Sequence, residues 1–268
     1  MIDVMGHFQL TSMPFSKGIP SRDLLQTETF KEASARLSYA VGNRCFALLT
    51  APPGCGKSTL LRHMADSLDP RTHLVIYIAE SKLTPRWLYN KMLEHFGAKG
   101  YLYRGDARKA VYELLAVQHE VKHKEIVCVI DEAHLLSRET LEETRFFLNT
   151  DMDSSTPLSL VLSGQSELLG RLRRPEMEAI RQRVETECRL LPLSEALVPG
   201  YIRAHLTSCG CQEEVFSPDA VSEVFRYSRG VPRMINRACM AGLTYATSRA
   251  ARRVSGLEMK EIIDKELS

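Results

Sequence analysis

The sequence predicts an α/β fold: a five-stranded parallel sheet between helices, followed by a C-terminal region that is entirely helical. Up to residue 191, short runs of β-branched and apolar residues alternate with helical patterns, as is typical of a parallel sheet covered on both faces. After Pro192 the strand signals stop, and the later segments have the spacing of amphipathic helices. The expected strands are Cys45–Thr50, His73–Ala79, Glu125–Ile130, Leu158–Ser163 and Thr186–Leu190.

Helix-start signals lie between these strands, where the alternation requires helices. Thr84 followed by Pro85 has the pattern of a cap and a first-turn proline, and Ser137 stands directly before another helical run. The run from Phe30 to Val41 places its apolar residues on one helical face. The cap residues and the apolar helical face therefore favour strands that alternate with helices.

The composition is that of a globular protein with a sizeable core, with 44% hydrophobic and 25% charged residues. The longest apolar runs are much shorter than the roughly 20 residues that cross a bilayer. The first residues lack the charged and apolar blocks of a secretory signal. Seven cysteines, an odd number without framework spacing, indicate reduced thiols. We therefore expect a cytoplasmic protein without a membrane partner.

Charge is distributed unevenly, although the net charge is only +2. Residues 82–109 hold seven Lys or Arg against two acids, and residues 226–254 hold seven arginines and no acid. Residues 126–160 hold seven acids against two arginines. This pattern indicates a polarised surface rather than a general polycation.

The stretch TAPPGCGKSTL, residues 50–60, nearly matches the phosphate-binding loop G-x-x-x-x-G-K-[ST]. It follows an expected strand and opens an expected helix, so backbone N–H groups and the helix dipole would cradle phosphates. Lys57 would reach the β- and γ-phosphates of ATP, and the Ser58 hydroxyl would bind Mg²⁺. The expected nucleotide-contacting residues of the loop are Pro53, Gly54, Cys55, Gly56, Lys57, Ser58 and Thr59.

Ala51 stands where the loop pattern has its first glycine. This position lies at the exit from the strand rather than against the phosphates. An alanine there costs about 1–2 kcal/mol if the backbone needs a positive φ, and nothing if φ is negative. The sequence leaves this choice open.

The stretch IVCVIDEAHLL places two acids at the end of an apolar strand, the edge where open α/β sheets bind ligands. Asp131 would hold Mg²⁺ through water, and Glu132 would act as general base on the attacking water. His134 is expected to pack or to form a hydrogen bond at the strand end rather than to sense phosphate. The sequence therefore predicts an ATPase that converts ATP and water to ADP and phosphate.

Together these segments resemble the AAA+ ATPases, in which an α/β core is followed by a helical lid. Within that family the order of segments is similar to the ExeA-like group and to transposition ATPases of the TniB/TnsC type. The stretches that carry the resemblance are MPFSKGIP, APPGCGKST, IAESKLTP, VIDEAHLLSRETLEETRFFLN, LVLSGQSEL, IRQRV and YSRGVPRMIN. The resemblance implies an N-terminal segment beside the nucleotide over residues 1–26, an ATPase core over 27–191 and a lid over 192–268.

The resemblance also implies roles for single residues. Gln165 is the expected polar sensor of the γ-phosphate, with Ser163 as the second choice. Arg183 matches the arginine finger that completes the site of a neighbouring subunit, and Arg181 is its rival, with salt bridges on a helix as the alternative for both. Arg233 matches a lid arginine that contacts phosphate. Such arginines imply self-association into a ring or a helical filament.

Two functions from different classes follow. As in the transposition ATPases that the chain resembles, ATP-bound subunits would oligomerise on duplex DNA and recruit or activate a transposase, and hydrolysis would drive disassembly. Lysines, a hydroxyl group and a helix N-terminus suit sequence-independent contacts with the DNA backbone. A solvated basic helix face is the alternative. The expected DNA-contacting residues are Lys82, Thr84, Arg86, Lys99 and Arg104.

The second function is that of an ExeA-like ATPase that couples energy to a secretion or envelope assembly system. Relatives of that kind carry a transmembrane helix and a wall-binding domain, neither of which this sequence shows, so we expect the first function. A third option is a relative of DNA-repair or initiator-type clamp loaders.

Overall fold

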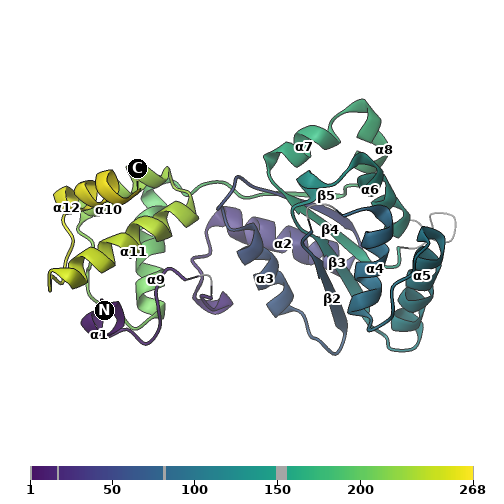
Figure 1. Cartoon of the computed structure of the whole chain (residues 1–268), viewed down its shortest axis with the longest axis horizontal. Helices are drawn as coiled ribbons and strands as arrows, with labels where there is room; N and C mark the ends of the chain where they lie inside the picture. The colour runs from purple at the N-terminus through teal and green to yellow at the C-terminus, as the bar shows by residue number, and fades with distance from the viewer. Residues whose placement is uncertain (1, 17, 81–82, 149–155, 268) are drawn as a thin grey trace. The chain divides into compact units, whose positions relative to one another are not determined.

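The structure is a computed structural model that describes residues 2–16, 18–80, 83–148 and 156–267. It contains two compact units, each with its own hydrophobic core (Figure 1). The sheet unit comprises Thr29–Pro52 and Leu60–Leu190, and the helical unit comprises Met1–Glu28, Pro53–Thr59 and Leu191–Ser268.

The sheet unit is built on five parallel strands in the order β2-β3-β4-β1-β5. The strands are β1 Phe46–Thr50, β2 His73–Ile78, β3 Glu125–Ile130, β4 Ser159–Gly164 and β5 Thr186–Arg189. The predicted fold class is confirmed, and each strand bound differs from the predicted one by at most one residue.

The centre of this sheet is formed by apolar runs. Strands β1, β3 and β4 are buried along nearly their whole length. Completely buried side chains such as Leu49, Ile76 and Val129 each contribute roughly 1.5–3 kcal/mol of transfer free energy. Burial on both faces requires helices on both faces. Figure 1 shows α2 and α3 on one side of the sheet, and α4 and α5 on the other.

The helices that follow the strands begin at the predicted caps. The Trp87 N–H donates to the Thr84 hydroxyl at 3.4 Å, and the Thr140 N–H donates to the Ser137 hydroxyl at 3.1 Å. The helices are α2 Glu28–Gly42, α3 Lys57–Ser67, α4 Pro85–His95, α5 Arg104–Glu120, α6 Arg138–Glu143, α7 Ser166–Leu172 and α8 Glu178–Arg181. Short 3₁₀ turns lie at η2 Ala133–Leu135, η3 Thr144–Leu148 and η5 Pro175–Met177.

The helical unit joins the two ends of the chain around one core. Val4, Phe8 and Phe15 are buried together with side chains of the C-terminal helices, and the Thr11 N–H donates to the Cys209 carbonyl at 2.9 Å. The sequence did not predict this packing of the N-terminal segment. The helices are α1 Val4–Phe8, α9 Val198–Ser208, α10 Pro218–Ser228, α11 Pro232–Ser248 and α12 Gly256–Ile262. Short 3₁₀ turns lie at η1 Ser21–Asp23 and η6 Glu195–Leu197, and a π-helical segment lies at η7 Ile263–Leu267.

Parallel pairing brings the carboxyl ends of three strands to one edge of the sheet. Thr50 at the end of β1 is in register with Gly164 at the end of β4, and Ile130 at the end of β3 is in register with Leu162. Residues that follow these strands therefore emerge at the same edge. This edge is where ligands bind in open α/β sheets.

The seven cysteines are free thiols, and all are buried, as expected for reduced cysteines. Burial raises the pKa of Cys128 to about 12, so this thiol stays protonated. Within the described ranges, every helix is too short or too polar to cross a bilayer.

Candidate nucleotide-binding site

The predicted phosphate loop joins β1 to α3. Gly54 and Gly56 have φ angles of +82° and +90°, which glycine adopts without a Cβ penalty. Helix α3 begins at Lys57, so the N–H groups of its first turn lack intrahelical acceptors and are available to an anion. Lys57 is buried and Ser58 is exposed.

The remaining predicted loop residues differ in burial. Pro53 is exposed, Thr59 is half-buried and Cys55 is buried. Burial raises the pKa of the Cys55 thiol, against a smaller opposing effect of nearby Lys57. Cys55 therefore lines the loop as a neutral side chain and leaves anion binding to the backbone and Lys57.

Ala51 causes no strain at the exit from β1. It does not adopt a positive φ, and its N–H donates to the Gly164 carbonyl at 3.2 Å. Of the two possible backbone conformations at Ala51, the one without a positive φ is correct. The missing glycine of the pattern therefore costs nothing.

The start of α11 lies against the loop. The Arg233 N–H donates to the Gly54 carbonyl at 3.2 Å, and a Cβ on Gly54 would lie 2.8 Å from the Arg233 Cβ and 3.0 Å from the Val231 Cγ1. Glycine is thus required at position 54 both by its φ and by this close approach. The exposed side chain of Arg233 begins beside the loop, where the resemblance implied a phosphate-contacting arginine.

Asp131 follows β3 and is 3% exposed. Its Oδ2 accepts a hydrogen bond from the Tyr77 hydroxyl at 2.7 Å. Its Oδ1 accepts from the Ser163 hydroxyl at 2.7 Å and from the Glu132 N–H at 2.9 Å. These three donors are neutral, so they orient the carboxylate without cancelling its charge. Such a group fits a hydrated divalent cation.

Glu132 has a backbone conformation that few non-glycine residues adopt, with φ 53° and ψ 28°. This conformation costs of order 1–3 kcal/mol and is typical of functional sites. The Glu132 side chain is 41% exposed, and its Oε2 lies 3.7 Å from the His134 Nε2. The two adjacent acids therefore have different environments: Asp131 is fixed and buried, whereas Glu132 reaches solvent.

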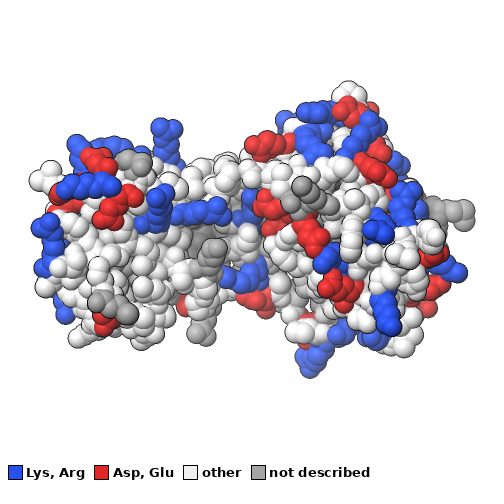
Figure 2. Space-filling view, in the orientation of Figure 1, with Lys and Arg blue, Asp and Glu red and all other residues white. Residues whose placement is uncertain are grey.

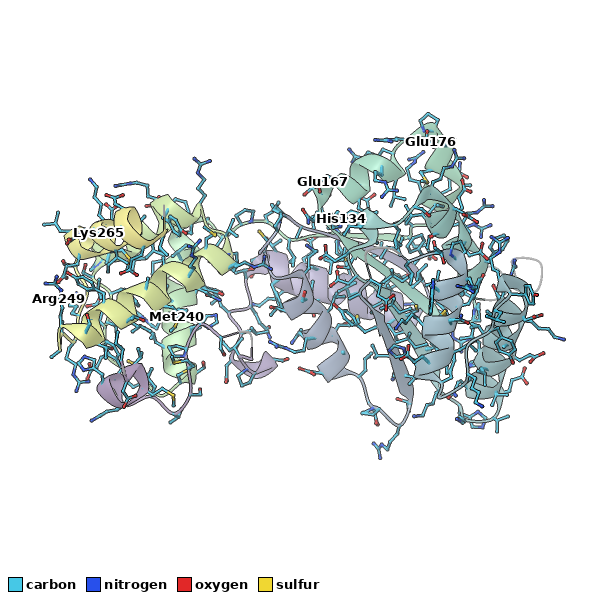
Figure 3. The ribbon with its side chains drawn as sticks, viewed as in Figure 1. His134, Glu167, Glu176, Met240, Arg249 and Lys265 are labelled. Atoms are coloured by element: carbon cyan, nitrogen blue, oxygen red, sulfur yellow. The ribbon has the colours of Figure 1, made fainter. Side chains whose placement is uncertain are left out.

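The two sensor candidates also differ. Ser163 is buried and donates to Asp131. Gln165 is half-buried at the start of α7, and its N–H donates to the His134 Nδ1 at 3.4 Å. Figure 3 shows His134 in the same region of the sheet unit as Glu167 of α7. The expected hydrogen-bonding role of His134 is present, while the role of Gln165 as a phosphate sensor stays a prediction.

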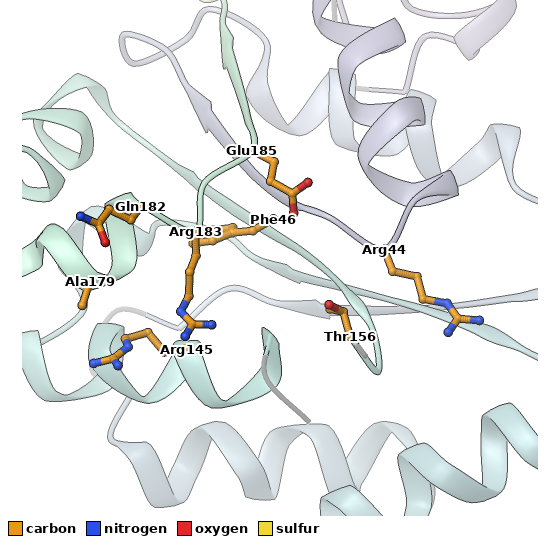
Figure 4. Close-up of a pocket in the computed structure, with 8 residues that line it drawn as sticks. All are labelled: Arg44, Phe46, Arg145, Thr156, Ala179, Gln182, Arg183 and Glu185. Atoms are coloured by element: carbon orange, nitrogen blue, oxygen red, sulfur yellow. The ribbon is translucent and has the colours of Figure 1, made fainter. Parts of the chain in front are cut away.

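The two arginine-finger candidates precede β5. Arg181 and Glu178 form an exposed pair at 3.6 Å, which is the helix salt bridge considered from the sequence. Arg183 instead lines a polar cavity with Arg145 (Figure 4). This cavity lies near the amino ends of the strands rather than near Asp131. The structure does not bring Arg183 to the edge that holds Asp131.

Of the residues expected to contact DNA, two can be placed simply and one cannot be placed. Lys82 lies outside the described residues. Thr84 caps α4 through its hydroxyl, and Lys99 is exposed.

The two remaining basic residues of this group make contacts within the chain. Arg86 donates to the Leu102 carbonyl at 3.2 Å, and Arg104 pairs with Glu139 at 3.1 Å. Figure 2 shows basic and acidic side chains interspersed over this face of the sheet unit. The visible face therefore lacks a continuous basic track among its described side chains.

Tyr77 is the residue that the sequence analysis missed. It lies on β2, is 43% exposed, and holds Asp131 through its hydroxyl. Burial and the bond to Asp131 raise the pKa of Tyr77, so the phenol remains a donor. The signal was present in the stretch HLVIYI, where a tyrosine with a polar tip follows an apolar run just before the carboxyl end of the strand.

A glycine loop between strand and helix, an acid pair at the end of β3 and a strand order that places β4 between β3 and β1 define a P-loop nucleoside triphosphatase. Residues 41–172 match a family model described as an AAA domain, AAA_22. The chain belongs to the AAA+ P-loop ATPases.

Among curated proteins, the chain is similar to general secretion pathway protein A of Aeromonas hydrophila. The two are 33% identical over 252 residues, which are 92% of this chain and 45% of that protein. The chain therefore spans about half the length of this relative.

Solved structures share the fold at low sequence identity. Cdc6p of Pyrobaculum aerophilum is 17% identical with a TM-score of 0.68, over 90% of this chain and 67% of that chain. ORC1 of Aeropyrum pernix in complex with DNA is 18% identical with a TM-score of 0.69, over 93% of this chain and 67% of that chain. These similarities establish the fold alone. The process that the ATPase drives must be inferred from other observations.

Proposed function

We propose that this chain is the ATP-hydrolysing part of an ExeA-like system that couples ATP to secretion or envelope assembly. The observation that carries the proposal is the 33% identity over 92% of this chain to general secretion pathway protein A. This similarity reverses the order of preference that the sequence analysis gave. The TniB/TnsC subgroup has no comparable support.

The residues present fit Mg²⁺ and ATP. The positive φ angles of Gly54 and Gly56 open the loop for phosphate. Lys57 and the first turn of α3 supply positive charge and donors. Ser58 and Asp131 would hold the metal, and Asp131 is already oriented by neutral hydroxyl groups. The metal would neutralise charge that develops on the phosphates.

Other polar residues would each have a separate role in ATP hydrolysis. Glu132, exposed at the strand end, would accept a proton from the attacking water as the bond between the γ-phosphate and ADP breaks. Gln165 would position that water or sense the γ-phosphate, and Arg233 would contact phosphate from beside the loop. Arg183 would act on the nucleotide of a neighbouring subunit, so the working form would be an oligomer.

A DNA-coating regulator of transposition is the second candidate and stays a prediction. The basic stretch of residues 82–109 favours it. The ion pair of Arg104 with Glu139 reduces the charge available to a DNA backbone, and the hydrogen bond of Arg86 to the Leu102 carbonyl occupies one of its donors. A transposase partner has no support beyond the resemblance of the sequence motifs.

The experiment that separates the two functions is ATP hydrolysis with and without non-specific duplex DNA at two salt concentrations, with assembly followed by light scattering. We expect hydrolysis that Glu132→Gln abolishes and that DNA leaves unchanged within twofold. Stimulation or ATP-dependent assembly that needs DNA, weakens with salt and is lost in Lys99→Ala with Arg86→Ala would instead establish the DNA-binding function.

A further inference from the structure

The turn that follows the acid pair is attached to the end of β4 and to α7. Arg171 of α7 donates hydrogen bonds to the carbonyls of His134 and Leu136, the second at 2.7 Å. At the last residue of β4, a Cβ on Gly164 would lie 3.1 Å from the His134 backbone nitrogen, so glycine permits this close approach. The backbone of His134 is therefore held from two sides.

A further hydrogen bond fixes which ring nitrogen of His134 carries the proton. The Gln165 N–H, at the start of α7, donates to the His134 Nδ1 at 3.4 Å. A backbone N–H can only donate, so Nδ1 is the acceptor and the proton of the neutral imidazole is on Nε2. His134 is thus a neutral donor whose N–H lies on the far side of the ring from Gln165.

This donor lies beside the acid that would act as general base. The His134 Nε2 is 3.7 Å from the Glu132 Oε2, and the two side chains are 9% and 41% exposed. Among the residues that the structure describes, no other side chain reaches the Glu132 carboxylate within hydrogen-bond or ion-pair distance. The imidazole is therefore fixed, whereas the carboxylate has room to rotate toward it.

A separation of 3.7 Å is longer than a hydrogen bond. Hydrogen bonds of catalytic groups are often long before the substrate binds, and they shorten in the complex. A small rotation of the Glu132 side chain would bring Oε2 within reach of Nε2. The neutral N–H would then orient the carboxylate without supplying an opposite charge.

We propose that His134 is a positioning residue for ATP hydrolysis, which orients Glu132 through its Nε2–H. This inference rests on the proposed function, in which Glu132 is the general base. The bond from Nε2 to Oε2 leaves Oε1 to accept a proton from the attacking water. The water oxygen bonds to the γ-phosphorus as the bond between this phosphorus and ADP breaks.

Two substitutions separate the two ring nitrogens. Glutamine places an amide nitrogen near the position of Nε2, whereas asparagine reaches only the position of Nδ1. His134→Asn should lower kcat roughly tenfold to a hundredfold, because a misplaced base loses much of its catalytic contribution. The KM for ATP should stay within about twofold, since ground-state binding is unchanged. His134→Gln should keep kcat within about threefold of the wild type, because it retains the donor.

The matched control is His95→Asn, at an exposed histidine whose Nδ1 contacts the Lys91 carbonyl within α4. Its kcat should remain within twofold of the wild type. Thermal unfolding of all three variants reports on the fold. An equal loss of kcat in His134→Gln and His134→Asn would show that His134 has only a structural role and would contradict the proposal.

A second arm asks whether His134 contacts the nucleotide instead. Glu132→Gln should bind ATP without hydrolysing it, and adding His134→Asn should leave its ATP dissociation constant within twofold. If the double variant loses affinity for ATP but not for ADP, His134 contacts the γ-phosphate and the proposal is wrong. If Glu132→Gln retains wild-type turnover, Glu132 is not the base and the proposal is also wrong.

A third measurement does not depend on turnover. Two-dimensional proton–nitrogen NMR of the histidine rings, with the His134 signal assigned by its absence in His134→Gln, should place the proton of neutral His134 on Nε2. Glu132→Gln should shift this signal. A proton on Nδ1, or a signal that Glu132→Gln leaves unchanged, would overturn the proposal. If wild-type protein does not hydrolyse ATP, the proposed function fails, while this measurement still decides the role of His134.

Discussion

Strand β3 carries a carboxylate at each end, and the two have opposite partners. Glu125, its first residue, forms an ion pair with Arg44, and its side chain is 37% exposed. Asp131, the residue after its last, is buried and receives hydrogen bonds only from neutral groups among its described contacts. One carboxylate has a cationic partner within the fold, whereas the other has no cationic partner among its described contacts.

This contrast shows how to separate a structural acid from a functional one. A buried charge is costly unless it is paired or hydrogen-bonded. Hydrogen bonds from two hydroxyl groups and a backbone N–H lower this cost at Asp131, but they supply no opposite charge. At Asp131 the opposite charge that we propose is a divalent cation, which agrees with the place of this residue at the carboxyl edge of the sheet.

The largest effect is expected at Asp131. Asp131→Asn keeps the shape of the side chain and removes the charge that would hold magnesium. ATP hydrolysis should fall by at least about a hundredfold, because the metal supplies several kcal/mol of transition-state stabilisation. Turnover measured over a series of magnesium concentrations checks this, and wild-type turnover in the variant would remove Asp131 from the site.

A smaller effect is expected at Tyr77. Tyr77→Phe removes the hydroxyl that donates to Asp131 Oδ2 at 2.7 Å and leaves the ring in place. Turnover should fall roughly tenfold and the magnesium requirement should rise, since partners of this kind typically contribute 10–100-fold to metal affinity or activity.

The matched control for Tyr77→Phe is Tyr39→Phe, at a tyrosine that is 59% exposed. It should behave as wild type. An unchanged magnesium requirement in Tyr77→Phe, with lower thermal stability alone, would show that Tyr77 is only structural.

The smallest effect is expected at the other end of β3. Hydrogen bonds from Arg44 lower the pKa of Glu125 in the folded protein. The pair therefore stabilises the fold above the usual pKa range of glutamate, and this contribution is lost as pH falls through the lowered pKa. Glu125→Gln should cost less than about 1 kcal/mol at neutral pH, since the pair is partly exposed.

Denaturant unfolding at neutral and acidic pH checks this prediction. The difference between Glu125→Gln and wild type should shrink in acid, and hydrolysis should be unchanged at neutral pH. If Glu125→Gln lost as much turnover as Asp131→Asn, the distinction between a structural Glu125 and a functional Asp131 would be wrong.

The sequence by itself determined the elements whose signals are local. The strands follow from continuous apolar runs, and the helix starts at Thr84 and Ser137 follow from cap residues whose hydrogen bonds span three positions. The phosphate loop and the acid pair are also contiguous, so spacing alone located Lys57 and Asp131.

Only the tertiary structure decided the features that depend on residues far apart in the chain. Tyr77 and Ser163 contact Asp131 because β2 and β4 flank β3 in the sheet. No single segment of the sequence specifies this strand order. Arg145 and Arg183 share a cavity because the amino ends of β1, β4 and β5 converge there. The backbone at Ala51 is likewise set by its bond to Gly164 on a neighbouring strand, which no local pattern specifies.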